Sequence, residues 1–230
     1  MSTDANEQSL EIEAIRQVGA RRALVLTIGI AAAVAFVVLR LVVALGGRTP
    51  LPMDEWWHAL MVATLTNVGV VVAFVPSNVG STIGMIVIGI IVCVLLWWKR
   101  GRGDAATFAA AIVLVVAIGA PMSYIIGRLR PDDSLAEKLA TSFPSGHTAV
   151  ATTFVVILGL LLRRWYVWVV GVVWVLLMMW SRTYLHAHWL SDVLAGLFEG
   201  IAVACLVWCA AEAIRDRRAI RTNDEVPGES

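Results

Sequence analysis

The sequence predicts an all-α integral membrane protein with six transmembrane helices and an interfacial helical segment on the outer side of the membrane. Of its 230 residues, 59% are hydrophobic and only 15% are charged, and the mean hydropathy is +0.80. Soluble domains are about half apolar and about one quarter charged, and disordered chains are more polar still. The net charge of +1 gives no reason to expect nucleic acid as a partner.

Six apolar runs are long enough to cross a bilayer. A spanning helix needs about 20 residues, because a rise of about 1.5 Å per residue must cover about 30 Å of hydrocarbon. The candidate spans are Ala23–Leu45, Thr82–Trp98, Ala105–Gly127, Ser145–Leu162, Trp165–Trp180 and His188–Ala211. The first run follows a polar, arginine-containing segment and lacks a small-residue cleavage pattern, so we expect an uncleaved anchor.

The stretch from Trp56 to Trp98 has no charged residue and is long enough for two crossings. Basic clusters decide its topology, because positive charge favours cytoplasmic loops. With six crossings, every basic cluster lies on the cytoplasmic side with Arg21 and Arg22: these clusters are Lys99, Arg100 and Arg102; Arg163 and Arg164; and Arg215, Arg217 and Arg218. We therefore predict that Met53–Ser77 is an interfacial or re-entrant helix on the outer side, broken near Pro76, Asn78 and Gly80.

These spans divide the chain into three parts. Residues 1–22 form a cytoplasmic N-terminal segment, residues 23–212 form one six-helix domain, and residues 213–230 form a frayed cytoplasmic tail. The expected location is the plasma membrane, with both termini cytoplasmic. The three cysteines, Cys93, Cys205 and Cys209, lie in apolar runs without metal-ligand spacing, so we expect buried thiols and neither a disulfide nor a zinc site.

One polar motif on the outer face is Phe143-Pro144-Ser145-Gly146-His147-Thr148. Proline prevents the helix from extending backwards, and Ser145 is a good N-cap. Gly146 leaves the backbone open to a ligand, and the positive end of a helix attracts anions. His147 stands beside that anion site. A capped helix with an incidental histidine would give the same local pattern.

A second motif runs from Ser181 to Asp192 and contains Arg182, His186 and His188. We expect His188 to open the last membrane helix, with Asp192 one turn later on the same face. A carboxylate that accepts the Nδ1 proton leaves Nε2 with an outward lone pair, as a nucleophilic histidine requires. An ordinary surface pair of histidine and aspartate is the alternative reading.

Two arginines complete the polar set. The guanidinium groups of Arg130 and Arg182 are suited to binding phosphate oxygens and to neutralising charge on a phosphoryl group during transfer. No acidic cluster with metal-ligand spacing accompanies them, so we predict no metal and no other cofactor.

The chain resembles the type 2 phosphatidic acid phosphatase superfamily of membrane lipid phosphatases, which is related in fold to the vanadium haloperoxidases. The family motifs are Lys-x6-Arg-Pro, Pro-Ser-Gly-His and Ser-Arg-x5-His-x3-Asp. The second is complete at Pro144–His147, and the third at Ser181, Arg182, His188 and Asp192. The first is partial, because Arg130-Pro131 is present but Ser123 stands where the family has lysine.

The resemblance implies a role for each matched residue. His188 is the nucleophile, Asp192 supports it, and His147 protonates the leaving oxygen and then activates water. Phosphate binding falls to Arg130, Ser145, Gly146 and Arg182. Arg128 is a candidate source of the charge that Ser123 does not supply.

The predicted function is hydrolysis of a lipid phosphate or diphosphate through a phosphohistidine on the extracytoplasmic face. The partners are the bilayer and its lipid substrate, with polyprenyl diphosphate, phosphatidylglycerophosphate and phosphatidic acid all possible. The alternative is an inactive lipid-phosphate-binding protein or a transporter, for which the intramembrane Glu199 is the strongest candidate residue. We expect His58 to lie at the lipid headgroups, and His186 to be a solvent-exposed rim residue.

Overall fold

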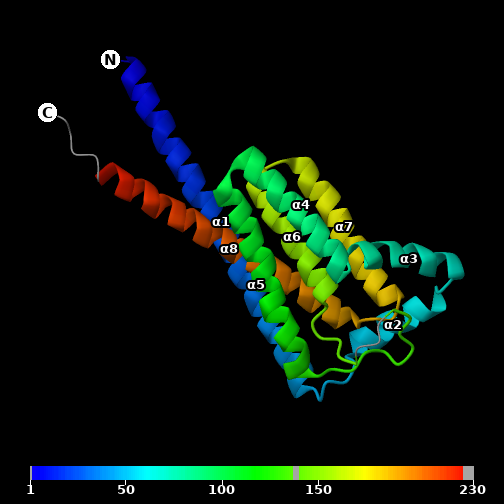
Figure 1. The fold of residues 1–230 in the computed structure, drawn as a ribbon. Helices are drawn as coiled ribbons and strands as arrows, with labels where there is room; N and C mark the ends of the chain where they lie inside the picture. Colours follow the sequence, from blue (N-terminus) through cyan, green and yellow to red (C-terminus); the bar gives the residue numbers. More distant parts are fainter. Residues whose placement is uncertain (1, 137–139, 225–230) are drawn as a thin grey trace.

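The structure, a computed structural model, describes residues 2–136 and 140–224 (Figure 1). These residues form a helical bundle, with one isolated bridge between Leu129 and Thr141 as their only β pairing. The helices are α1 (Ser2–Leu45), α2 (Pro52–Ala63), α3 (Asn67–Val79), α4 (Thr82–Arg100), α5 (Arg102–Ile126), α6 (Gly146–Leu162), α7 (Trp165–Tyr184) and α8 (Leu190–Asp224). The predicted all-α class is confirmed.

Helix α6 lies inside the bundle and packs against α5, α7 and α8, while α1 packs along α8. The described ends of the chain project together from one end of the bundle, and α2 and α3 lie across the opposite end (Figure 1). Large apolar side chains cover the outer surface, as shown by Ile83, Trp98 and Val170, which are all exposed. Such a surface suits lipid and not water.

Among the described residues, five helices are long and apolar enough to cross a membrane: α1 from Arg16, α4 from Ile83, α5, α7, and α8 as far as Arg221. The protein is therefore a multi-pass membrane protein. The sixth predicted crossing is α6, which has 17 residues and falls just below the usual length for a span. The six-crossing topology stays a prediction.

Several helix ends and breaks differ from the predictions. Helix α8 begins at Leu190, so His188 lies in the preceding loop and does not open the helix. The predicted frayed tail is helical as far as Asp224. The outer segment consists of two helices that are separated at Thr64–Thr66, and Pro76 lies within α3. The predicted break is correct only at Gly80, which caps the end of α3.

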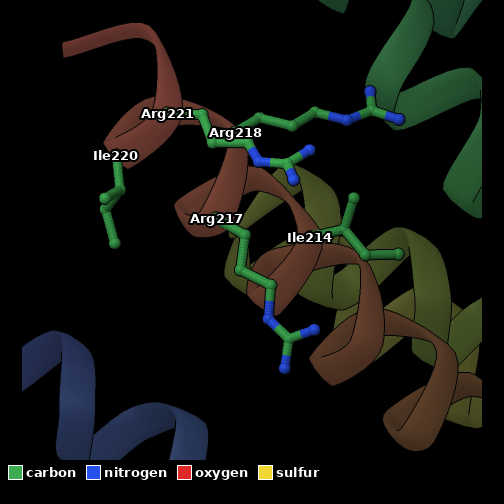
Figure 2. Close-up of a pocket in the computed structure, with 5 residues that line it drawn as sticks. All are labelled: Ile214, Arg217, Arg218, Ile220 and Arg221. Carbon is green, nitrogen blue, oxygen red and sulfur yellow. The ribbon is translucent and has the colours of Figure 1, made fainter. Parts of the chain in front are cut away.

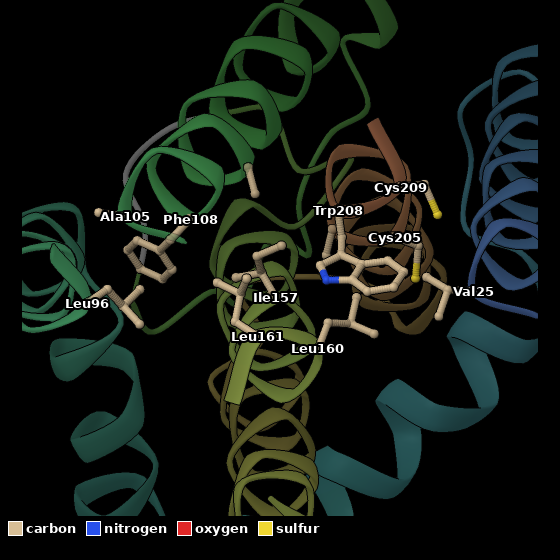
Figure 3. Close-up of a cluster of buried hydrophobic side chains, with 12 residues drawn as sticks. Val25, Leu96, Ala105, Phe108, Ile157, Leu160, Leu161, Cys205, Trp208 and Cys209 are labelled. Carbon is tan, nitrogen blue, oxygen red and sulfur yellow. The ribbon is translucent and has the colours of Figure 1, made fainter. Parts of the chain in front are cut away.

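The main apolar core joins five helices (Figure 3). Phe108 from α5, Ile157 from α6 and Trp208 from α8 are buried there, together with Val25 from α1 and Leu96 from α4. The thiols of Cys205 and Cys209 are free and buried in the same cluster, as the sequence predicts. Helices α1 and α8 approach closely, because a Cβ added at Gly29 would lie 2.9 Å from Cβ of Cys205.

The basic clusters gather at the end of the bundle that carries the termini. Arg21 donates to the carbonyl of Leu160 (2.9 Å), and Arg100 donates to that of Leu161 (2.8 Å). Arg215 contacts Asp104 at 2.9 Å. Beyond it on α8, Arg217, Arg218 and Arg221 line a shallow groove of about 430 Å³ (Figure 2). This groove contains none of the motif residues.

Candidate active site

Both motif loops lie at the end of the bundle opposite the termini. Residues 127–145 join α5 to α6, and residues 185–189 join α7 to α8. The first loop contains a short antiparallel pairing, in which the amide of Arg130 donates to Ala140 (3.1 Å) and that of Ser142 donates to Arg128 (2.8 Å). This pairing sets Arg130 and Ser142 side by side, and both contact His188.

The ring of His188 is buried and lies between a carbonyl and a guanidinium group. Its Nδ1 is 2.8 Å from the carbonyl oxygen of Ser142, and its Nε2 is 3.1 Å from Nη1 of Arg130. A carbonyl can only accept and a guanidinium can only donate a hydrogen bond. The proton therefore lies on Nδ1 and the lone pair on Nε2. Burial, and then the charges of Arg130 and Arg182, lower the pKa of His188 well below its usual value.

Asp192 does not accept the Nδ1 proton, contrary to the prediction from the sequence. Its Oδ2 lies 3.8 Å from Nδ1 of His188 and instead accepts from the backbone amide of Trp189 at 2.9 Å. Its Oδ1 accepts from Arg128 at 2.6 Å. Because His188 precedes the helix, the two residues do not have the helical i, i+4 arrangement that the prediction assumed. Asp192 supports the loop and supplies negative charge near the ring.

Arg128 is a fully buried partner of two carboxylates and not a phosphate contact. Besides Asp192, it donates to Oδ2 of Asp54 at 2.6 Å and to the carbonyl of Thr49. Ser191 donates to Asp54 through its backbone amide (2.7 Å) and its hydroxyl (2.8 Å). The charge of Arg128 is thus already paired with Asp54 and Asp192, and this pairing does not favour the hypothesis that Arg128 replaces the charge missing at Ser123.

Helix α6 starts at the candidate site. Ser145 is the N-cap residue, but its hydroxyl makes no capping bond and instead lies 3.1 Å from Oγ1 of Thr148. Its amide donates to the backbone carbonyl of Asp192 at 3.0 Å, which ties α6 to α8. Gly146 is exposed, and a Cβ there would meet nothing within 4 Å. The first turn is thus open to an anion.

Arg182 and His147 approach the same place from α7 and α6. Arg182 is fully buried, and its Nη1 donates to the hydroxyl of Ser77 on α3 at 2.6 Å. His147 lies close to the backbone of Ser77 and interacts electrostatically with Arg182, His188 and Arg130. The structure thus brings together the histidines and arginines that the sequence singles out.

Three contributors were not identified from the sequence: Asp54, Ser77 and the carbonyl of Ser142. Asp54 is an acidic residue at the edge of a long charge-free stretch, which is a weak signal for a buried partner. The other two are a common hydroxyl and a backbone atom, and neither has a distinctive sequence pattern. Ser123, at the family lysine position, makes a 2.7 Å hydroxyl contact with Thr141 and anchors the first loop to α5.

These features define a class of protein: a multi-pass helical membrane protein with a histidine–arginine site at one end of the bundle. The sequence model of the PAP2 superfamily matches residues 104–216, and the chain is similar to this family over that range. This confirms the resemblance drawn from the motifs.

An undecaprenyl-diphosphatase of Sulfolobus acidocaldarius is 32% identical over 123 residues, which cover 50% of this chain and 59% of that protein. The match thus spans little more than half of that relative. The fold is similar to that of a transmembrane PAP2-type phosphatidylglycerolphosphate phosphatase from Bacillus subtilis. In that comparison the TM-score is 0.71 and the identity is 21%, over 81% of this chain and 96% of the other. LpxE of Aquifex aeolicus gives a TM-score of 0.61 at 20% identity, over 69% and 96%.

Proposed function

We propose that the protein is a phosphatase that hydrolyses a membrane lipid phosphate or diphosphate, with a polyprenyl diphosphate as the favoured substrate. The observation that carries the proposal is the lone pair on Nε2 of His188, which accepts a hydrogen bond from the guanidinium of Arg130. A nucleophile beside a cation is suited to attack on a phosphoryl group. The undecaprenyl-diphosphatase among its relatives supports the choice of substrate.

In the first step, Nε2 of His188 attacks phosphorus and forms a P–N bond while the bond to the leaving oxygen breaks. His147 gives a proton to that oxygen. The carbonyl of Ser142 holds the Nδ1 proton, and the charge of Asp192 favours the cationic phosphohistidine. For a diphosphate substrate the leaving group is a lipid monophosphate, and for a monophosphate it is a lipid alcohol.

In the second step, water attacks phosphorus, gives a proton to His147 and releases inorganic phosphate as the P–N bond breaks. Arg130 and Arg182 neutralise charge on the phosphoryl oxygens, and Ser145 and the open turn at Gly146 bind the remaining oxygens. In this mechanism guanidinium groups do the work that a divalent metal does in other phosphatases, so we propose metal-independent catalysis.

The lipid tail has a place beside this site. An apolar groove of about 500 Å³ lies along α4, α6 and α7, and is lined by residues that include Val79, Phe154, Leu158 and Trp174. One of its lining residues, Val79, lies two positions after Ser77 in the sequence, and Ser77 contacts Arg182 and His147. At its other end the groove reaches Tyr166, near the opposite end of the bundle. A headgroup in the site and a tail in this groove would suit a lipid lying in the bilayer.

We propose further that the active site faces the extracytoplasmic side and both termini face the cytoplasm. The basic clusters at the end of the bundle that carries both termini support this orientation, because such clusters favour the cytoplasmic side. Labelling of single cysteines introduced at exposed Asp132 and exposed Lys99 in intact cells tests it. Label from outside should reach only the Asp132 position, and the reverse pattern would reject the orientation.

The central test is phosphate release from undecaprenyl diphosphate, undecaprenyl phosphate, phosphatidylglycerophosphate and phosphatidic acid in detergent, with and without EDTA. We expect release that EDTA leaves unchanged and that His188→Ala abolishes. With radiolabelled diphosphate, acid-labile phosphoprotein should accumulate in His147→Ala, because a lipid monophosphate can leave with little help from an acid, whereas hydrolysis of the phosphohistidine still needs His147 to activate water. Turnover by a folded His188→Ala variant would reject the nucleophile, and loss of turnover in EDTA at an unchanged melting temperature would reject the metal-free mechanism.

A further inference from the structure

Outside the catalytic set, a second polar cluster lies at the same end of the bundle. His58 from α2, Asp133 from the α5–α6 loop and His186 from the α7–α8 loop each offer one possible ligand atom to the cluster. Nε2 of His58 is 3.2 Å from Oδ2 of Asp133, and Nδ1 of His186 is 2.8 Å from the same oxygen. All three ligand atoms lie within 4.8 Å of one another.

We propose that His58, Asp133 and His186 bind a divalent transition-metal ion, with Zn²⁺ the preferred ion. Bond lengths of about 2.0–2.1 Å in a tetrahedral site place neighbouring ligand atoms about 3.3 Å apart. The two shorter separations in the cluster are within about 0.5 Å of this spacing. Two imidazoles and one carboxylate suit Zn²⁺, whereas Mg²⁺ and Ca²⁺ prefer sites made of oxygen atoms.

His186 gives independent support for a ligand. Its side chain is only 3% exposed, so the expected solvent-exposed rim position is wrong, and apart from the 2.8 Å contact of Nδ1 with Asp133 its ring nitrogens have no hydrogen-bond partner among the described residues. Its φ of 51° lies in the left-handed region, which is uncommon for a residue other than glycine. Buried polar atoms nearly always have a partner. A cation bound by both Nδ1 of His186 and Oδ2 of Asp133 would account for their close approach and for the position in which the backbone holds the ring.

An ion can reach this cluster. The side chains of His58 and Asp133 are 22% and 48% exposed, whereas that of His186 is buried beneath them. The ring of Trp189 lies 5.4 Å from that of His58 and borders the cluster on one side. Solvent can therefore fill the remaining coordination position, as expected for three protein ligands and one water.

The proposed ion would join three separate segments. Asp133 follows Arg130 by three residues in the first motif loop, and His186 precedes His188 by two in the second. The backbone amide of Leu135 already donates to the carbonyl of Leu185 at 3.0 Å, which joins the same two loops. The ion would thus hold both loops against α2. It takes no part in the phosphoryl transfer proposed above, because neither Arg130 nor His188 is a ligand.

The test measures metal binding by the full chain, purified in detergent without a polyhistidine tag and stripped with EDTA. Calorimetric titration with ZnCl₂ gives stoichiometry and affinity, and Co²⁺ absorption reports the coordination geometry. Asp133→Asn removes a proposed ligand. Asp132→Asn is the matched control, because it removes the same charge from the adjacent exposed residue.

We expect wild type and Asp132→Asn to bind one Zn²⁺ per chain, to show the visible spectrum of tetrahedral Co²⁺ and to melt at a higher temperature with Zn²⁺. Asp133→Asn should bind Zn²⁺ at least tenfold more weakly and lose the shift in melting temperature. His58→Asn should do the same, which keeps the test decisive if Asp133→Asn melts early without metal. Absence of stoichiometric binding to wild type, or undiminished binding to both ligand variants, would overturn the proposal. Phosphate release is not measured, so this result is independent of the proposed activity.

Discussion

Nε2 of His188 lies 3.1 Å from Nη1 of Arg130, and the same nitrogen of Arg130 donates to the carbonyl of Ala187. The guanidinium group of Arg130 therefore faces the lone pair of His188, the candidate nucleophile. It is held in place by the backbone carbonyl of Ala187, the residue that precedes His188. Any phosphoryl group within reach of that lone pair would also be within reach of the positive charge. Binding and attack on phosphate thus depend on the same arginine.

The first prediction concerns Arg130. Arg130→Gln should lower phosphate turnover by about 10²–10³-fold, the usual cost of losing one donor to a developing oxyanion. Arg130→Lys should recover part of this loss, because an ammonium keeps the charge but not the planar pair of donors. Steady-state kinetics on undecaprenyl diphosphate measure both variants.

The control is Arg48→Gln, which removes an exposed arginine near the start of α2. It should turn over substrate at the wild-type rate. Equal losses in Arg48→Gln and Arg130→Gln would mean that only the overall positive charge matters, and would contradict a specific role for Arg130.

The second prediction concerns the buried ion-pair network of Arg128. Asp54→Asn leaves Arg128 with one carboxylate partner in a site without solvent, and should destabilise the protein by about 3–5 kcal/mol, the usual cost of breaking a buried pair. Glu55→Gln, an exposed neighbour on α2, is the matched control and should change stability little. Melting temperatures in detergent compare the two. An Asp54→Asn variant as stable as Glu55→Gln would show that a neutral amide pairs with Arg128 as well as the carboxylate does.

The sequence alone was sufficient to predict the membrane class and the gathering of both motif loops at one end. The length of each apolar segment and the positions of the arginines can be read directly from the sequence. They predict the class well because the bilayer requires both features, whatever the packing of the helices. The motif residues are also local, since each motif occupies one short stretch of the chain, at a loop and the adjoining helix ends. These features required no knowledge of long-range packing.

The contacts that hold the site depend on long-range packing and on backbone atoms. Asp54 contacts Arg128 and Ser191 from far away in the sequence, and Ser77 contacts Arg182 in the same way. The acceptor for His188 is a carbonyl group, which every residue possesses, so no residue type identifies it. The starting point of α8 also mattered, because a shift of two residues removed the expected bond between His188 and Asp192.

The third prediction concerns the turn between α2 and α3. The hydroxyl of Tyr184 donates to the carbonyl of Thr64 at 2.9 Å and accepts from the amide of Thr66 at 3.0 Å, so it ties both helices to the end of α7. Tyr184→Phe leaves both backbone groups without this partner and should destabilise the protein by about 1–3 kcal/mol. Tyr124→Phe, at a side chain that is 81% exposed, should have almost no effect on the melting temperature.

Turnover in Tyr184→Phe should fall less than in Arg130→Gln, because the hydroxyl acts only through the position of α3 and Ser77. Unchanged stability in Tyr184→Phe would show that water replaces the hydroxyl at this turn.

The last prediction separates two roles for Asp192. In a catalytic triad with a direct bond from aspartate to histidine, replacing the aspartate by asparagine lowers turnover by about 10⁴-fold, because the histidine adopts the wrong tautomer. Here the carbonyl of Ser142 holds Nδ1, and Asp192 binds Arg128 instead. Asp192→Asn should therefore keep the correct tautomer of His188, and its turnover should fall much less than about 10⁴-fold.

The Asp192→Asn variant should also be less stable than wild type, because a buried partner of Arg128 loses its charge. Melting temperature and turnover, measured on the same preparation, test both effects. A loss near 10⁴-fold at unchanged stability would mean that Asp192 bonds His188 directly when substrate is bound.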